Sequence, residues 1–169
     1  TLPLMKKICQ DVVKEGCVLL ENDGVLPLNN KRIALFGRCQ INTFYAGYGS
    51  GGDVKSPYKV SLLDGLLNHN AILHKGLMNE YINWTKENIP DEGWWGNWPL
   101  CFPEMPISNE FAKKISKESD VAVFIVGRSA GEDRDVLNGK GSWYLNDEEK
   151  EILNVLRTNF NKLCILINS

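Results

Sequence analysis

The sequence has few of the side chains that metal centres and thiol chemistry require. It contains only two histidines, His69 and His74, and five cysteines, no two of which are close enough to form a CxxC pair. A structural zinc site draws four such ligands from short, paired spacings. We therefore expect no metal site. The odd number of cysteines, several within apolar runs, suits free thiols in a reducing compartment.

Strong charge and long hydrophobic runs are also missing. The net charge is −2, and the 19 lysines and arginines are scattered along the chain, so nothing favours nucleic acid or an anionic membrane as a partner. No apolar run approaches the roughly 20 residues that cross a bilayer. The first 16 residues carry charges every few positions and have no signal-peptide core. We expect a cytoplasmic protein, or a chain whose true start has been removed.

Short apolar runs alternate with amphipathic stretches along the chain. This alternation predicts a mainly parallel sheet covered on both faces, a three-layer α/β/α sandwich. The chain stops at Ser169, directly after its last apolar run, so we expect the domain to be truncated at its C-terminal end. The expected strands are 32–37, 71–74, 121–127 and 163–168, and the expected helices are 4–20, 61–67, 77–87 and two that begin after Ser108 and Asn146.

Four consecutive charged residues, 132–135, follow the predicted strand 121–127. Ligands of parallel α/β proteins gather outside the carboxyl ends of the strands, where this run lies. One interpretation is a solvated loop in which Arg134 pairs with Asp133 or Asp135. The other is a carboxyl group that donates a proton, which requires a pKa raised by burial or by a second carboxylate. The residues alone leave both interpretations open.

The glycines of segment 46–53, AGYGSGGD, match the spacing G-x-G-x-x-G of a dinucleotide site. Their context argues against a Rossmann-type oxidoreductase, because Gly47 lies ten positions after Gly37 and Pro57 precedes the next helix. We expect no cofactor. The segment is a flexible turn, or a loop whose small residues let a partner or ligand approach the backbone closely.

Three tryptophans, Trp94, Trp95 and Trp98, lie in a segment broken by glycine and proline. They form either a small core that pins the loop down or a stacking surface for a sugar ring. Nucleic-acid stacking would require interleaved lysine and arginine, and residues 91–106 contain neither.

Several segments, in this order, resemble the α/β sandwich domain of glycoside hydrolase family 3, the family of many β-glucosidases. They are EGCVLLENDGVLPL (15–28), RIALFGRCQ (32–40), YGSGG (48–52), SLLDGL (61–66), DVAVFIVGRSAGEDRD with GSWYLNDEEKEIL (120–153), and LCILINS (163–169).

The resemblance implies a two-domain enzyme. A (β/α)₈ barrel, which this chain does not contain, supplies an aspartate nucleophile, and the sandwich supplies a glutamate acid/base and part of the pocket wall. By position this glutamate is Glu132, although related members read S-G-E-G-Y-D-R where this chain reads A-G-E-D-R. Asp133 and Asp135 are the alternatives. The sequence is similar to a bacterial subgroup in which the sandwich precedes the barrel.

We therefore expect residues 1–169 to be a partial sandwich domain of a retaining β-glucosidase-like enzyme that hydrolyses terminal β-linked glucosyl residues. Its partners would be a carbohydrate substrate and the barrel of the same parent chain, and the fragment alone would be inactive. The alternative is a non-catalytic module that binds carbohydrate or a partner domain. Residues expected at the substrate pocket are Tyr48, Ser50, Arg128, Arg134, Trp94, Trp95 and Trp98.

Overall fold

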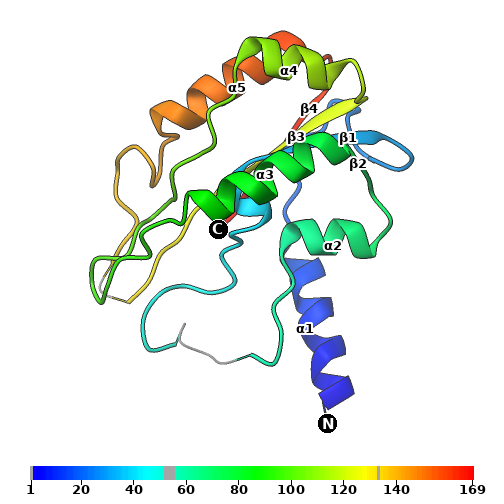
Figure 1. The fold of residues 1–169 in the computed structure, drawn as a ribbon. Helices are drawn as coiled ribbons and strands as arrows, with labels where there is room; N and C mark the ends of the chain where they lie inside the picture. The colour runs from blue at the N-terminus through cyan, green and yellow to red at the C-terminus, as the bar shows by residue number, and fades with distance from the viewer. Residues whose placement is uncertain (1, 52–55, 133) are drawn as a thin grey trace.

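The computed structural model describes residues 2–51, 56–132 and 134–169. Their strands form one four-stranded sheet in the order β2-β1-β3-β4, with every neighbouring pair parallel (Figure 1). The strands are β1 (Arg32–Phe36), β2 (Ile72–Leu73), β3 (Val121–Gly127) and β4 (Leu163–Asn168). The predicted parallel α/β sheet is confirmed, because apolar runs that are buried on both faces form its centre.

The two helices expected after Ser108 and Asn146 begin where these capping residues predict, whereas the helix expected at 77–87 begins two residues earlier, at Lys75, and the strand expected at 71–74 spans only Ile72–Leu73. The side chain of Ser108 accepts a hydrogen bond from the N–H of Phe111, and Asn146 with Glu149 forms a reciprocal capping box. The helices are α1 (Leu2–Gly16), α2 (Leu62–Asn68), α3 (Lys75–Glu87), α4 (Asn109–Ser116) and α5 (Asp147–Asn159), and a short 3₁₀ turn, η1 (Arg38–Gln40), follows β1.

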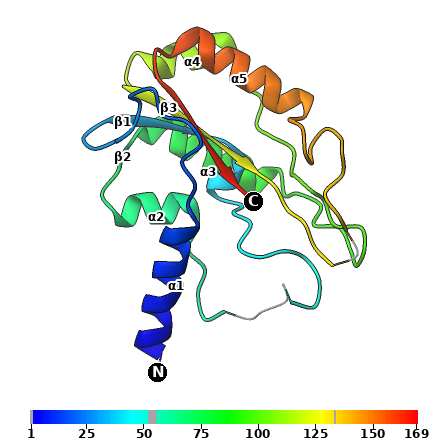
Figure 2. The same cartoon turned by 180° about the vertical axis from the view of Figure 1, so that it is seen from behind.

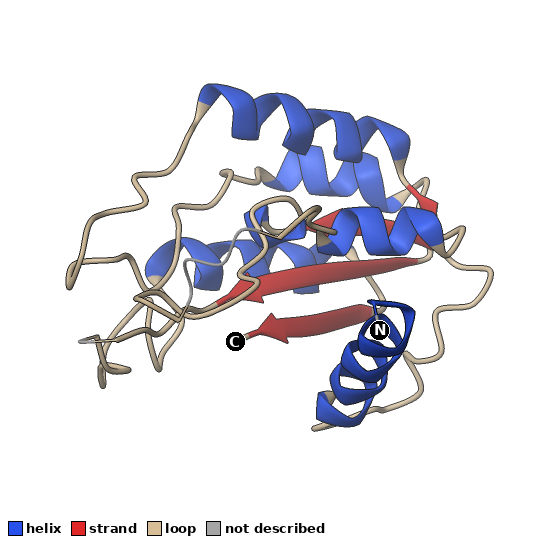
Figure 3. Ribbon diagram, turned by 90° about the horizontal axis from the view of Figure 1, so that it is seen from below, coloured by secondary structure: helices blue, strands red, loops and turns tan. Residues whose placement is uncertain are grey.

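Two hydrophobic clusters lie on opposite faces of the sheet. On one face, Phe36 and Phe124 pack against α3, α4 and α5. On the other, Leu35 and Ile125 pack against Leu63 of α2 and the side chains that precede β1. Figure 3 shows the N-terminal helix on one side of the two long strands and most of the other helices on the opposite side.

Strand β4 is only partly covered. Ile165 and Ile167 are 50% and 54% exposed on the face that holds Phe124, and Leu166 is 38% exposed on the face that holds Ile125. Figure 2 shows this strand, in red, without a described helix in front of it. No helix in the described part of the chain is long and apolar enough to span a membrane. The same part of the chain holds no group of three histidine, cysteine, aspartate or glutamate side chains suited to a metal ion.

The first predicted helix was too long. It ends at Gly16, not near residue 20, and its apolar side chains are exposed, with Leu4 at 62% and Val12 at 65%. Glycine is a poor helix former, so the helix ends there. The following residues run without regular structure toward the sheet, where Val25 and Leu28 join the second cluster.

Candidate active site

Two loops that follow β1 and β3 pair with each other beyond the carboxyl edge of the sheet. The N–H of Tyr48 donates to the carbonyl of Ala130 at 2.9 Å, and the N–H of Glu132 donates to the carbonyl of Tyr48 at 3.0 Å. Tyr48 and Gly131 thereby form an isolated parallel bridge. The sheet brings these loops together because β1 and β3 are parallel neighbours whose carboxyl ends meet at one edge.

Glycines allow this close pairing. A Cβ at Gly131 would lie 2.7 Å from the Cβ of Tyr48, and one at Gly49 would lie 2.5 Å from the Cβ of Glu132. Gly49 also has a φ of +108°, which other residues rarely adopt. The small residues of segment 46–51 therefore serve close backbone approach, and what they approach is the acidic loop of the same chain.

Glu132 lies at the centre of the pairing and is held by Ser50. The backbone N–H and the hydroxyl of Ser50 donate to Oε2 of Glu132 at 2.9 and 2.7 Å. These bonds stabilise the carboxylate and lower the pKa of Glu132. The described residues thus favour the ionised form, which suits a base, whereas a proton donor needs a raised pKa.

The other charged residues of this loop have different surroundings. Asp135 is exposed, and Asp133 lies outside the described residues. Arg134 pairs through its backbone with Gly131 and donates from Nη1 to Oδ1 of Asn97 at 2.9 Å. Its side-chain partner among the described residues is therefore an amide, and this bond ties the acidic loop to the tryptophan segment.

The tryptophan segment packs against the glycine loop. The rings of Trp98 and Tyr48 are parallel within 2° with centroids 5.4 Å apart, and Trp95 meets Trp98 edge-on at 5.1 Å. Tyr48 in turn contacts Phe44 edge-on. Trp94 and Trp95 remain 69% and 52% exposed. Trp98 therefore belongs to a small aromatic core, while the other two indoles are open to solvent.

Arg128 holds the end of β3 in place. Its Nε donates to the carbonyl of Ser142, its Nη1 to Gly127 and Glu149, and its Nη2 to Glu149 and Tyr144. The pair with Glu149 is bidentate, at 2.6 and 2.7 Å, and both side chains are nearly buried. All five guanidinium N–H groups are thus used inside the domain, which leaves none for a sugar.

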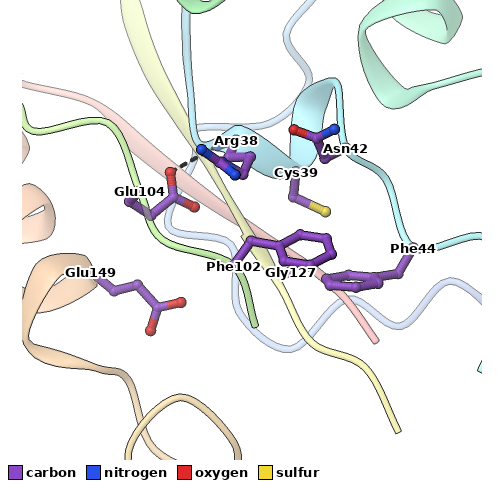
Figure 4. Close-up of a pocket in the computed structure, with 8 residues that line it drawn as sticks. All are labelled: Arg38, Cys39, Asn42, Phe44, Phe102, Glu104, Gly127 and Glu149. Carbon is purple, nitrogen blue, oxygen red and sulfur yellow. Dashed lines mark hydrogen bonds between the residues drawn. The ribbon is translucent and has the colours of Figure 1, made fainter. Parts of the chain in front are cut away.

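A buried cluster that we did not predict lies nearby (Figure 4). The guanidinium of Arg38 lies 4.3 Å from the ring centroid of Trp84, and the backbone N–H of Arg38 donates to Glu104 at 2.8 Å. Burial raises the pKa of Glu104 to about 8. The two residues line a cavity of about 10 Å³. Arg38 stands two positions after the end of β1, and a charged residue at the end of a strand is a signal that the sequence offers. Glu104 lies between Pro103 and Pro106, in a segment without a regular pattern, and the sequence offers no such signal for it.

Comparisons with known proteins agree with this architecture. The glycosyl hydrolase family 3 C-terminal domain matches residues 17–169. The chain belongs to this family. It is 40% identical to a β-glucosidase of Ruminococcus albus over 160 residues, which are 94% of this chain and 17% of that protein. It is 25% identical to β-glucosidase A of Butyrivibrio fibrisolvens, over 91% of this chain and 21% of that protein.

Solved structures of β-glucosidases contain the same fold. A glucose complex of β-glucosidase 3B from Thermotoga neapolitana superposes with a TM-score of 0.86 at 32% identity, over 99% of this chain and 24% of that one. A β-glucosidase from Paenibacillus barengoltzii gives 0.84 at 35% identity, over 89% of this chain and 17% of that one. The chain thus spans between a sixth and a quarter of these relatives' lengths.

Proposed function

We propose that residues 1–169 are a partial sandwich domain of a retaining β-glucosidase-like enzyme, and that Glu132 is its general acid/base. The observation that carries the proposal is the fixed position of Glu132 beyond the carboxyl edge of the sheet, where its own loop pairs closely with the loop of Tyr48 and Gly49. Membership of the family and the β-glucosidase relatives support the reaction class. The substrate would carry a terminal β-linked glucosyl residue.

The reaction needs two carboxyl groups about 5–5.5 Å apart. An aspartate of the (β/α)₈ barrel in the parent chain attacks the anomeric carbon, while protonated Glu132 gives its proton to the leaving oxygen. Ionised Glu132 then takes a proton from the water that hydrolyses the glycosyl-enzyme.

The bonds from Ser50 favour the second step. In the first step, the negative nucleophile nearby would raise the pKa of Glu132, and this influence ends when the nucleophile becomes an uncharged ester. The same carboxyl group can then act first as an acid and afterwards as a base. Trp94 and Trp95, with open indole faces, would stack on the leaving group side of the substrate.

The test compares Glu132→Ala in the parent enzyme with Asp135→Ala, which removes the alternative acid/base in the same loop. We expect kcat/KM on substrates with poor leaving groups to fall by about 10²–10⁴. Activated substrates should be affected less, and azide should restore part of the activity because it needs no base. If Glu132→Ala behaves like wild type, the acid/base is Asp133, Asp135 or another residue.

A non-catalytic module that binds carbohydrate or a partner domain is the second candidate. The exposed Trp94 and Trp95 and the lowered pKa of Glu132 favour it. A binding role predicts that substitution of Glu132 changes KM while the dependence on the leaving group stays as in wild type.

A further inference from the structure

We infer that Trp98 is a positioning residue for Glu132, acting through Tyr48, and not only a surface for sugar. Trp98 and Asn97 together form a clamp on the acidic loop, because Trp98 packs on Tyr48, which pairs with this loop, and Asn97 binds Arg134 of the loop. The inference rests on the proposed function, because it assigns a role to the residues that support the same acid/base.

The first step is that Tyr48 determines where Glu132 lies. Two backbone hydrogen bonds join Tyr48 to Ala130 and Glu132, and Ser50, two residues further on, binds the carboxylate of Glu132 twice. A shift of Tyr48 therefore moves both the backbone of Glu132 and the donors that orient its carboxylate.

The second step is that aromatic packing holds Tyr48. Trp98 lies parallel to its ring, and Phe44 meets the ring edge-on at 6.4 Å. Phe44 in turn stacks on Phe102 at 4.9 Å. Aromatic pairs of this kind contribute about 0.5–1.5 kcal/mol beyond the area they bury. Removal of Trp98 would take away the ring that stacks on Tyr48 and would leave the edge-on contact with Phe44.

The third step is that the clamp is preformed. In segment 91–98, Asp91 accepts a hydrogen bond from the N–H of Gly93, and the N–H of Asn97 donates to the carbonyl of Trp94. Gly93 has a φ of +70°, and a Cβ there would lie 2.5 Å from the carbonyl oxygen of Asn97. This turn presents Trp98 to Tyr48, which pairs with Glu132, and Asn97 to Arg134, two residues after Glu132.

The experiment compares four variants of the parent enzyme: Trp98→Ala, Trp98→Phe, Asn97→Ala and Trp143→Ala. Trp143 is 72% exposed on the loop before α5 and serves as the control for loss of an indole outside the clamp. We would measure kcat and KM against pH for aryl β-glucosides with poor and with activated leaving groups.

A misplacement of about 1 Å costs on the order of 10²-fold in rate. We therefore expect Trp98→Ala to lower kcat by about 10- to 100-fold on poor leaving groups and much less on activated ones. The alkaline limb of its pH profile should move to higher pH, since looser bonds from Ser50 stabilise the carboxylate less. Trp98→Phe should restore most of the activity, and Trp143→Ala should match wild type.

Three results would overturn the inference. In the first, Trp98→Ala raises KM and leaves kcat and the pH limb unchanged, as expected for a sugar contact alone. In the second, Trp98→Phe is as impaired as Trp98→Ala. The third result applies if Trp98→Ala does not fold, in which case Asn97→Ala decides. A wild-type kcat and pH profile of Asn97→Ala would then overturn the inference.

Failure of the inference is distinguishable from failure of the proposed function. If Glu132→Ala loses activity on poor leaving groups while Trp98→Ala behaves like Trp143→Ala, the clamp alone is wrong. If Glu132→Ala retains activity, the acid/base assignment itself is wrong.

Discussion

Among single residues, the carboxyl groups of Glu132 and Glu104 have pKa values shifted in opposite directions by their surroundings. Ser50 gives Glu132 two hydrogen bonds at an exposed position and lowers its pKa. Glu104 is 7% exposed, and its desolvation raises its pKa to about 8 although it accepts the N–H of Arg38. In both cases the local contacts decide the direction, not the type of residue.

Substitution of Ser50 should change the proposed second step. Ser50→Ala removes the hydroxyl donor and keeps the backbone N–H, so the pKa of Glu132 should rise. On activated glucosides, where ionised Glu132 acts as the base, the acidic limb of the pH profile of kcat should therefore move to higher pH. A hydrogen bond to a charged group contributes about 1.5–3 kcal/mol. We expect kcat on activated glucosides to fall about tenfold, measured by steady-state kinetics. An unmoved pH limb would contradict the importance of this bond.

Glu104 should make folding less stable as pH rises. Between its ordinary value of 4.5 and about 8, the folded state binds one proton more than the unfolded state at this site. The contribution of Glu104 to the free energy of unfolding therefore falls with rising pH across this window and is constant above it.

Glu104→Gln keeps an acceptor for the N–H of Arg38 and removes this titration. Its melting temperature should depend less on pH between pH 5 and 8 than that of wild type, as measured by scanning calorimetry. Exposed Glu80→Gln is the matched control and should retain the wild-type dependence. Equal pH dependence in the Glu104 variant and wild type would contradict the effect.

Among the elements, the end of β3 is the place where the strand, the loop before α5 and α5 itself are connected, close to the candidate site. Arg128 follows this strand and connects it to the loop before α5 and to Glu149 in that helix. The carboxylate of Glu149 accepts a hydrogen bond from the N–H of Asn146, which caps α5, and it also forms the ion pair with Arg128. One buried ion pair thus fixes the strand, the loop and the helix relative to one another, three residues before Gly131.

Loss of the ion pair between Arg128 and Glu149 should destabilise the domain strongly. Arg128→Met leaves the carboxylate of Glu149 buried without its partner, which costs about 3–5 kcal/mol. The matched control is Arg32→Met, which removes an exposed, solvent-screened pair with Asp120 and should cost far less. Thermal or denaturant unfolding measures both, and equal losses would show that burial of the Arg128 pair is unimportant.

At the scale of the whole molecule, the proposed reaction needs more than this chain. The chain spans 17% of the length of the Ruminococcus albus relative. In the proposal, the nucleophile belongs to the barrel of the parent chain, so the described domain holds one carboxyl group of the required pair.

The isolated 169-residue chain should therefore hydrolyse no aryl β-glucoside, even when circular dichroism shows that it is folded. The assay is release of the chromogenic leaving group at a protein concentration well above that used for the parent enzyme. Robust turnover that survives further purification would sink the two-domain mechanism.

The sequence by itself determined the elements of this fold. The apolar run of residues 121–127 specifies a strand buried on both faces, and Asn146 with Glu149 specifies a helix start, because both signals act between residues near in the chain. The first helix was predicted too long because its apolar spacing continues past Gly16, whereas a backbone effect ends it.

Only the tertiary structure decided what surrounds Glu132. Ser50 is 82 residues away in sequence, and Asn97 is 37 residues from Arg134. The order of the strands brings these segments to one edge, and glycines without side chains let the loops meet there. Residue type marked Arg128 and Trp98 as candidates for substrate contact. Their use inside the domain depends on partners that only the folded chain places beside them.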